Sequence, residues 1–331
     1  MKNIIKKLLL TISPLYRKID SIQNSLENIY KYIVNQNEYN ENIQNKLEKV
    51  ENCLINHTDQ INKYIQREYI YNDIFKTKKI LKERNIKGKQ VDFESILEFH
   101  YSKLINIGDN VFDIGAHAGR HLNIFKKLVG KQGKVFAFEP LPDQYNVLIE
   151  IFKDDNIIIK NMALSNIHRE MDFFSCENYP EESGLNKRTI FNNKDAYGKT
   201  IKVEVDILNN YIDKIDNLKF IKIDTEGAEI SILQGGDKLI NKFRPFISVE
   251  YGYAGYSAYN YNRNSLYELC EKYNYFITDL FGNIIPNIEI WNNICDSVYW
   301  DYFLIPKEKL EEFWLCIHDF NMNFNLFSFP D

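Results

Sequence analysis

The stretch that decides the fold of this chain is Val111-Phe-Asp-Ile-Gly-Ala-His-Ala-Gly119. A short apolar run ends near an acid, two glycines follow four residues apart, and an amphipathic run begins at Arg120 and extends to Val129. This order predicts a buried strand, a tight glycine loop and a helix. Glycines allow the loop backbone to approach a ligand closely and to direct its N–H groups toward it.

A second apolar run, residues 134–138, predicts a neighbouring strand that ends at Glu139, twenty residues after Gly119. An acid at this distance is typical of a residue that holds a ribose diol. The loop reads G-x-x-x-G, not the G-x-G-x-x-G of dinucleotide-binding proteins, and Asp113 would repel a pyrophosphate. A carboxylate there instead suits the ammonium and sulfonium groups of S-adenosylmethionine. The glycine loop alone is also compatible with a buried turn that binds no ligand.

A third apolar run ends in acids at Asp224 and opens a helix after Thr-Glu-Gly-Ala-Glu229. At this point the chain resembles the FkbM-type family of S-adenosylmethionine-dependent methyltransferases. The one departure is His117, where the family more usually has Asn. The resemblance covers roughly residues 90–305 and rests on the order and spacing of six motifs: Asp113-Ile-Gly-Ala-His-Ala-Gly119, Phe138-Glu-Pro140, Ala163-Leu-Ser165, Val205-Asp206, Lys222-Ile-Asp-Thr-Glu-Gly-Ala-Glu229 and Val249-Glu250.

Alternating strand and helix patterns predict an α/β fold with a mostly parallel sheet, helices on both faces and one antiparallel strand. The resemblance implies the seven-stranded form of class I methyltransferases. It also implies S-adenosylmethionine as the cofactor and O-methylation, often of a sugar hydroxyl in a glycan or glycoconjugate. The residues expected to bind the cofactor lie in the family motifs: Asp113, Gly115, Ala116, His117, Gly119, Glu139, Pro140, Ala163 and Asp224.

The expected catalytic residues are Asp224, Glu226 and Glu250, which stand at or just after two strand ends. We expect Asp224 to orient the acceptor hydroxyl or to accept its proton, with Glu226 assisting and Glu250 shaping the far wall. His117 is the alternative base, because histidine titrates near neutral pH. The carboxyl groups of Asp224, Glu226 and Glu229 could hold Mg²⁺. Acids at the start of a helix are also stabilised by the helix dipole without a metal, so no metal is predicted.

Two segments have an unusual composition. Residues 176–200 are polar and charged, without periodicity, and a loop of this length is usually functional or mobile. Residues 251–261 contain five tyrosines, which would suit stacking on a sugar but are equally compatible with a loop packed on the core. The acceptor specificity is expected in these two segments.

Ahead of this domain, apolar residues recur at alternating steps of four and three from Leu15 to about Tyr64. This heptad pattern predicts a coiled coil and a homo-oligomer, although a helix folded back on its own domain remains the alternative. The predicted domains are therefore 1–70, for oligomerisation, and 71–331, the methyltransferase domain. Residues 1–12 are basic and apolar, so they could touch a membrane surface as an amphipathic helix or simply begin the long helix.

Net charge, cysteine spacing and the length of the apolar runs exclude further classes of function. A net charge of −5 argues against nucleic acid as the main partner. Five scattered cysteines show no metal-ligand spacing, and no apolar run is long enough to span a bilayer, so we expect a cytoplasmic protein. Two alternatives stay open: a nicotinamide-dependent sugar dehydrogenase, and a coiled-coil interaction protein whose methyltransferase-like domain is inactive.

Overall fold

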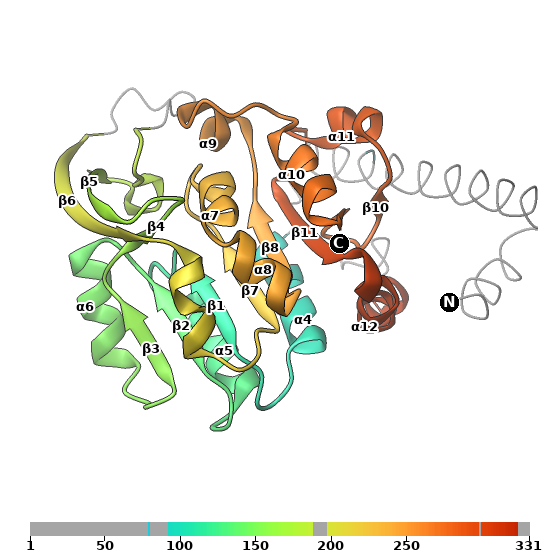
Figure 1. The fold of residues 1–331 in the computed structure, drawn as a ribbon, viewed down its shortest axis with the longest axis horizontal. Coiled ribbons are helices and arrows are strands. Elements are labelled where there is room, and N and C mark those ends of the chain that lie inside the picture. Colours follow the sequence, from blue (N-terminus) through green and yellow to red (C-terminus); the bar gives the residue numbers. More distant parts are fainter. Residues whose placement is uncertain (1–78, 80–91, 188–196, 298, 324–331) are drawn as a thin grey trace, which may run out of the picture. The chain divides into compact units, whose positions relative to one another are not determined.

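The computed structural model describes residues 79, 92–187, 197–297 and 299–323 (Figure 1). All of them belong to one compact unit, Ile70–Asp331. The predicted coiled coil at 15–64 and the predicted membrane contact at 1–12 lie outside the described residues, so both stay predictions. Within the described ranges, no helix combines the length and the apolar character that a membrane crossing needs.

The core is a sheet of eight strands in the order β10-β9-β11-β8-β7-β1-β2-β3. Five of them, β3, β2, β1, β7 and β8, pair in parallel. β11 pairs antiparallel with β8 and β9, and β10 pairs antiparallel with β9. The strands are β1 (Val111–Ile114), β2 (Val135–Phe138), β3 (Ile157–Lys160), β7 (Phe220–Ile223), β8 (Phe246–Glu250), β9 (Tyr275–Asp279), β10 (Ile284–Ile285) and β11 (Asp301–Pro306).

The predicted α/β fold with a mostly parallel sheet is therefore confirmed, with two differences. The sheet has eight strands instead of seven, and two antiparallel strands instead of one, because the short β10 pairs with the outer side of β9. A hairpin strand of two residues carries no alternation pattern long enough to recognise in the sequence.

Aromatic side chains show how helices cover both faces of this sheet. In β1, Phe112 packs on Tyr211 of the 3-10 helix η2 (Leu208–Lys214). Phe220 is the register partner of Val111 and therefore points to the opposite face, since neighbouring strand residues alternate. There it packs on Tyr101 of α4 (Phe93–Leu104) and on Phe125 of α5 (Arg120–Val129). Burial of these rings on both faces stabilises the packing of the helices on the sheet.

The remaining helices connect the strands or close the sheet. They are α6 (Pro142–Ile151), α7 (Glu229–Gly235), α8 (Asp237–Phe243), α9 (Tyr253–Ala258), α10 (Ser265–Tyr273), α11 (Ile288–Ile294), the 3-10 helix η3 (Lys307–Lys309) and α12 (Leu310–Asn323). Two of them correct the sequence-based expectation. The tyrosine-rich segment contains a short helix, α9, and α11 separates β10 from β11 where no helix was recognised.

A second, three-stranded sheet stands beside the first, in the order β4-β6-β5 (Figure 1). Its strands are β4 (Ala163–Leu164), β5 (Arg169–Cys176) and β6 (Gly198–Asp206), and the 3-10 helix η1 (Pro180–Glu182) follows β5. The expected loop at 176–200 thus begins at the last residue of β5 and ends inside β6. A small apolar cluster, separate from the main core, joins this sheet to the segment after β2: Leu141, Ala163, Phe173, Val203 and Val205.

The chain order reverses at β1, because β2 lies on one side of it and β7 on the other. The carboxyl ends of parallel strands meet at one edge of the sheet, and ligands of open α/β sheets bind outside that edge, at the point of reversal. Gly115 follows β1, Glu139 follows β2, Asp224 follows β7, and Glu250 is the last residue of β8. The fold therefore brings four of the predicted site residues to one edge.

Candidate functional site

A cavity of about 180 Å³ opens at this edge of the sheet. Its walls come from the turns after β1 and β7, the end of β8, the segment after β2, strand β4 and the second sheet. Eight of the residues predicted for the site line it: Gly115, His117, Glu139, Pro140, Ala163, Asp224, Glu226 and Glu250. Three predicted cofactor-binding residues, Asp113, Ala116 and Gly119, are absent from its walls.

Gly115 and Gly119 are required by close packing between elements. Gly115 has a φ of +84°, and a Cβ there would lie 1.8 Å from the carbonyl oxygen of Asp224. The turn after β1 therefore touches the turn after β7 directly. Gly119, with a φ of +82°, begins α5, and a Cβ there would lie 2.8 Å from the side chains of Leu148 and Phe152. The packing of α5 against these two side chains therefore requires a glycine at position 119, whether or not a ligand binds.

His117 lies between these glycines in the left-handed region, with a φ of +44°. Among residues with a side chain, Asn, Asp and His tolerate this conformation best. The backbone conformation is therefore one that His can adopt and that Asn, the residue expected here from the family resemblance, would also suit. The His117 N–H donates a hydrogen bond of 2.8 Å to Oε2 of Glu139, so the glycine loop orients that carboxylate.

Glu139 is almost fully buried at the adenosine-binding position expected from the sequence, with 4% of its surface exposed. Its Oε1 accepts a hydrogen bond of 2.8 Å from the N–H of Leu141, and its Oε2 accepts the one from His117. Burial raises the pKa of Glu139 to about 7, although both hydrogen bonds favour the ionised form. Each oxygen accepts one hydrogen bond from the backbone and can accept another, and Glu139 lines the cavity, so a ligand hydroxyl could use this capacity.

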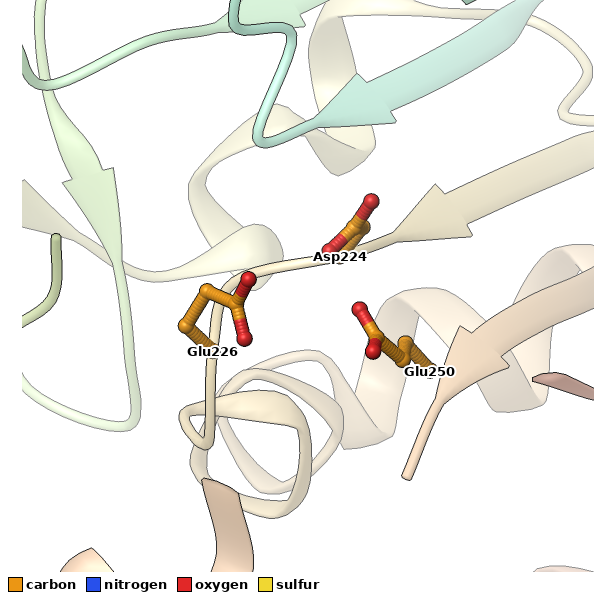
Figure 2. A group of neighbouring side chains, drawn as sticks. All are labelled: Asp224, Glu226 and Glu250. Atoms are coloured by element: carbon orange, nitrogen blue, oxygen red, sulfur yellow. The ribbon is translucent and has the colours of Figure 1, made fainter. Parts of the chain in front are cut away.

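Three of the carboxyl groups that line the cavity lie close together. Asp224 and Glu250 come from the ends of the adjacent strands β7 and β8, and Glu226 comes from the turn after β7. One oxygen from each lies within 4.8 Å of the other two, and Figure 2 shows the three groups facing one another. Sequence reasoning named all three, but only the pairing of β7 with β8 explains why Glu250 joins Asp224.

The pKa values of Asp224 and Glu250 are shifted in opposite directions. Burial raises the pKa of Glu250 well above its usual range, and the neighbouring Asp224 raises it further. Burial would also raise the pKa of Asp224, but the Lys222 cation and a hydrogen bond with Glu250 hold it at about 2. The two groups therefore titrate in separate steps, and Glu250 binds a proton before Asp224 does as the pH falls.

Lys222 is the functional neighbour that sequence reasoning missed. Its Nζ lies 3.0 Å from Oδ2 of Asp224, and only 4% of the residue is exposed. Burial alone would lower the pKa of Lys222, but Asp224 and Asp113 raise it, so the cation persists. A lysine two residues before an acid in an otherwise apolar strand was the available signal, since such residues share one face.

Asp113 lies beneath the site rather than in its wall. It is the register partner of Lys222 and is fully buried, and neither of its oxygens has a hydrogen-bond partner among the described residues. Burial raises its pKa, and Lys222 counteracts that rise. The sequence suggested direct contact of this acid with the ligand's cationic groups, whereas the strand pleat directs it toward the α4 and α5 face of the sheet.

Glu229 builds the turn that carries Glu226. Its Oε1 accepts hydrogen bonds from the N–H of Thr225 at 3.3 Å, from Oγ1 of Thr225 at 3.1 Å and from the N–H of Gly227 at 2.9 Å. Glu226 itself has a φ of +60°, a conformation that persists in non-glycine residues only where surrounding contacts enforce it. The Glu229 carboxylate therefore holds the turn together through these hydrogen bonds. Among the described residues, the three acids close enough to share a cation are Asp224, Glu226 and Glu250, whereas the sequence suggested Glu229 as the third.

Carboxylate oxygens are also the ligands that divalent cations prefer. The expected absence of a metal therefore stays a prediction.

The second sheet and the tyrosine-rich segment form the outer wall. Ser183 lines the cavity, and its Oγ accepts a hydrogen bond of 2.9 Å from the N–H of Cys176. Tyr259 also lines the cavity, whereas Tyr251 and Tyr256 are buried and stack on each other. The tyrosine-rich segment is therefore mainly a packed element, and one of its rings reaches the site.

The ionisable groups that line this cavity are mostly carboxyl groups. Its described walls include no lysine or arginine. They include five carboxyl groups, those of Glu139, Glu181, Asp224, Glu226 and Glu250. Such walls attract a cationic ligand and repel a phosphate.

The chain is similar in sequence to known methyltransferases. The chain is similar to methyltransferase sdnD of Sordaria araneosa, with 24% identity over 190 residues, or 45% of this chain and 69% of that protein. Among solved structures, it is similar to a methyltransferase FkbM from Methylobacillus flagellatus (15% identity, TM-score 0.38), covering 62% of this chain. The match spans only 47% of that bacterial chain.

Another similar structure is the fibrillarin of Aeropyrum pernix in complex with S-adenosyl-L-methionine (10% identity, TM-score 0.34), covering 61% of this chain and 68% of that one. The model of the methyltransferase FkbM domain matches residues 113–292. Because that match spans more than half of its sequence, the chain belongs to the FkbM family of methyltransferases.

Proposed function

We propose that this protein transfers the methyl group of S-adenosylmethionine to a hydroxyl group of a sugar in a glycan or glycoconjugate. The observation that carries the proposal is the cavity with five carboxyl groups and, among its described walls, no lysine or arginine. This charge suits a donor that carries a sulfonium and an ammonium group, and it disfavours the pyrophosphate of a nicotinamide cofactor. The match to a methyltransferase family is a second argument against the dehydrogenase alternative.

The cavity walls fit the two ends of such a donor. Glu139 is a buried acceptor for the two ribose hydroxyls, and apolar side chains beside it, including Pro140 and Ala163, suit the faces of an adenine ring. Gly115 and His117 would face the amino-acid end. When bound, S-adenosylmethionine supplies a methyl group on a sulfonium sulfur, which leaves as a neutral thioether once the acceptor oxygen has taken the methyl carbon.

The three clustered carboxyl groups would then act on the acceptor hydroxyl. A carboxylate with a pKa of about 2 is a weak base, so Asp224 suits a fixed hydrogen-bond acceptor that orients the hydroxyl. Glu250, the group of the pair with the raised pKa, holds the proton of its hydrogen bond with Asp224. Glu226, whose carboxyl oxygen lies within 4.8 Å of the other two, is then the better group to receive the hydroxyl proton. This proposal moves the role of base from Asp224, favoured by the sequence, to Glu226.

The experiment is a methyl-transfer assay with isotope-labelled S-adenosylmethionine. Glycan, glycolipid, RNA and protein fractions of the source cell serve as acceptors, and methylated sugars are identified after hydrolysis. Glu226→Gln should lower single-turnover transfer about 10²-fold and change donor affinity less than a few-fold. Glu170→Gln removes an exposed carboxylate of β5 and serves as the matched control. Label that enters only RNA or protein would refute the proposal, and so would full activity of Glu226→Gln.

A further inference from the structure

A second, smaller hollow lies directly beside the acid cluster. Its volume is about 20 Å³, and it shares Glu226 and Glu250 with the main cavity. Three glycines, Gly227, Gly252 and Gly255, line it together with Trp300. The two carboxyl groups therefore stand between the proposed donor cavity and a hollow that opens on an indole ring.

Trp300 is held in place but left open to solvent. A Cβ on Gly252 would lie 3.2–3.3 Å from three of the indole carbons, so the glycine backbone packs closely against the ring. The carbonyl oxygen of Trp300 accepts a hydrogen bond of 2.7 Å from the N–H of Tyr251. Even so, 52% of Trp300 is exposed, whereas Trp291 is fully buried and its Nε1 donates to a backbone carbonyl.

This exposure has a physical cost that a ligand would remove. Water-exposed indole surface is unfavourable, and an aromatic face gains by covering the apolar side of another ring. A saccharide ring offers such a side, because its C–H bonds form an apolar face while hydroxyl groups project from the rim. Glu226 and Glu250 lie next to the indole as hydrogen-bond partners for those hydroxyls.

We propose that Trp300 is the platform on which the acceptor sugar stacks, and that this acceptor is a neutral saccharide rather than a sugar nucleotide, a sugar phosphate or RNA. The inference rests on the proposed function and names its substrate class. The hollow supplies its own argument for neutrality: its described lining contains Glu226, Glu229 and Glu250 and no lysine or arginine. A phosphate placed in this hollow would meet these carboxyl groups and no lysine or arginine of its described lining.

The experiment compares two matched acceptor sets with labelled methyl donor. One set contains neutral methyl glycosides and oligosaccharides of common hexoses, and the other contains the corresponding sugar 6-phosphates and nucleotide sugars. Transfer is expected to the neutral set. Trp300→Ala should lower kcat/KM for the neutral acceptor at least about tenfold, mainly through KM, and Trp300→Phe should restore most of it because a flat ring remains.

Tyr253→Ala provides the control. Tyr253 is also 52% exposed and follows Gly252 directly, but it lines neither hollow, so its loss should leave kcat/KM unchanged. Donor affinity, measured by calorimetry, should be the same in all variants. If the donor binds but transfer goes only to phosphorylated acceptors, to neither set, or equally well in Trp300→Ala, the inference is overturned. If the donor does not bind the wild-type protein, the proposed function itself fails.

Discussion

The pKa of Glu139 leads to a quantitative prediction about donor binding. In the proposed complex this carboxylate accepts hydrogen bonds from the ribose hydroxyls, for which it must be ionised. Its pKa of about 7 lies above the ordinary 4.5, because burial penalises the charge. Affinity should therefore be fully present above pH 7 and be lost as the pH falls through 7. At pH 6 only about one tenth of the protein would be competent, so the apparent Kd should be about tenfold weaker than at pH 8.

Glu139→Gln is the perturbation that isolates this effect. The amide keeps the size and loses the titration, but its NH₂ group must face the N–H of either His117 or Leu141, which each donate at 2.8 Å in the wild type. Leaving one buried donor without an acceptor costs about 1–3 kcal/mol. That cost is the same in the free and the bound protein, so it lowers stability. Donor affinity falls because the amide offers the ribose hydroxyls no charged acceptor, and a hydrogen bond to a charged group is worth about 1.5–3 kcal/mol, so the variant should bind the donor at least about tenfold more weakly at pH 8.

Calorimetric titration with S-adenosylmethionine at pH 6, 7 and 8 measures both effects. The amino group of the donor also titrates, and this contribution is common to both proteins. The difference between wild type and Glu139→Gln therefore reports Glu139 alone. Circular dichroism would establish that the variant is folded. Parallel pH profiles in the two proteins, or equal affinity at pH 8, would refute the assignment of Glu139 to the donor site.

The other predictions concern the scaffold and the assembly. Gly115→Ala would bring a Cβ within 1.8 Å of the Asp224 carbonyl oxygen and should lower the free energy of unfolding by more than about 3 kcal/mol, whereas Gly108→Ala, whose nearest neighbour is 3.9 Å away, should lose about 1–2 kcal/mol for its positive φ. Equal losses in denaturant titrations would contradict the contact. Glu229→Ala should cost about 2–3 kcal/mol, because three hydrogen bonds to the site turn disappear, and Glu229→Gln should cost clearly less, because an acceptor oxygen remains; similar thermal unfolding of both variants would disprove this role. Deletion of residues 1–70 should yield a smaller particle in light scattering that still binds the donor, and an unchanged oligomer would locate the interface in the catalytic domain.

The positions of the strand-end residues followed from local pattern. Apolar runs that end at Glu139, Asp224 and Glu250 predict buried strands, and the carboxyl ends of parallel strands meet at one edge of the sheet. The sequence could therefore predict the α/β fold and which acids would lie at that edge. The departure at His117 was also visible, but its left-handed backbone, which explains it, was not.

Contacts between distant parts of the chain decided the rest. The register of β1 with β7 places Asp113 and Lys222 side by side on the same face of the sheet. A shift of one residue would have turned the Asp113 side chain to the opposite face. The proton shared by Asp224 and Glu250 depends on burial and on the pairing of β7 with β8. Trp300 reaches the hollow because β11 returns antiparallel to β8 and places Asp301 opposite Glu250. The sequence by itself determined which residues end the strands, since that depends on local hydrophobicity. Only the tertiary structure determined which of them share a charge, a proton or a cavity, since these properties depend on strand register and burial.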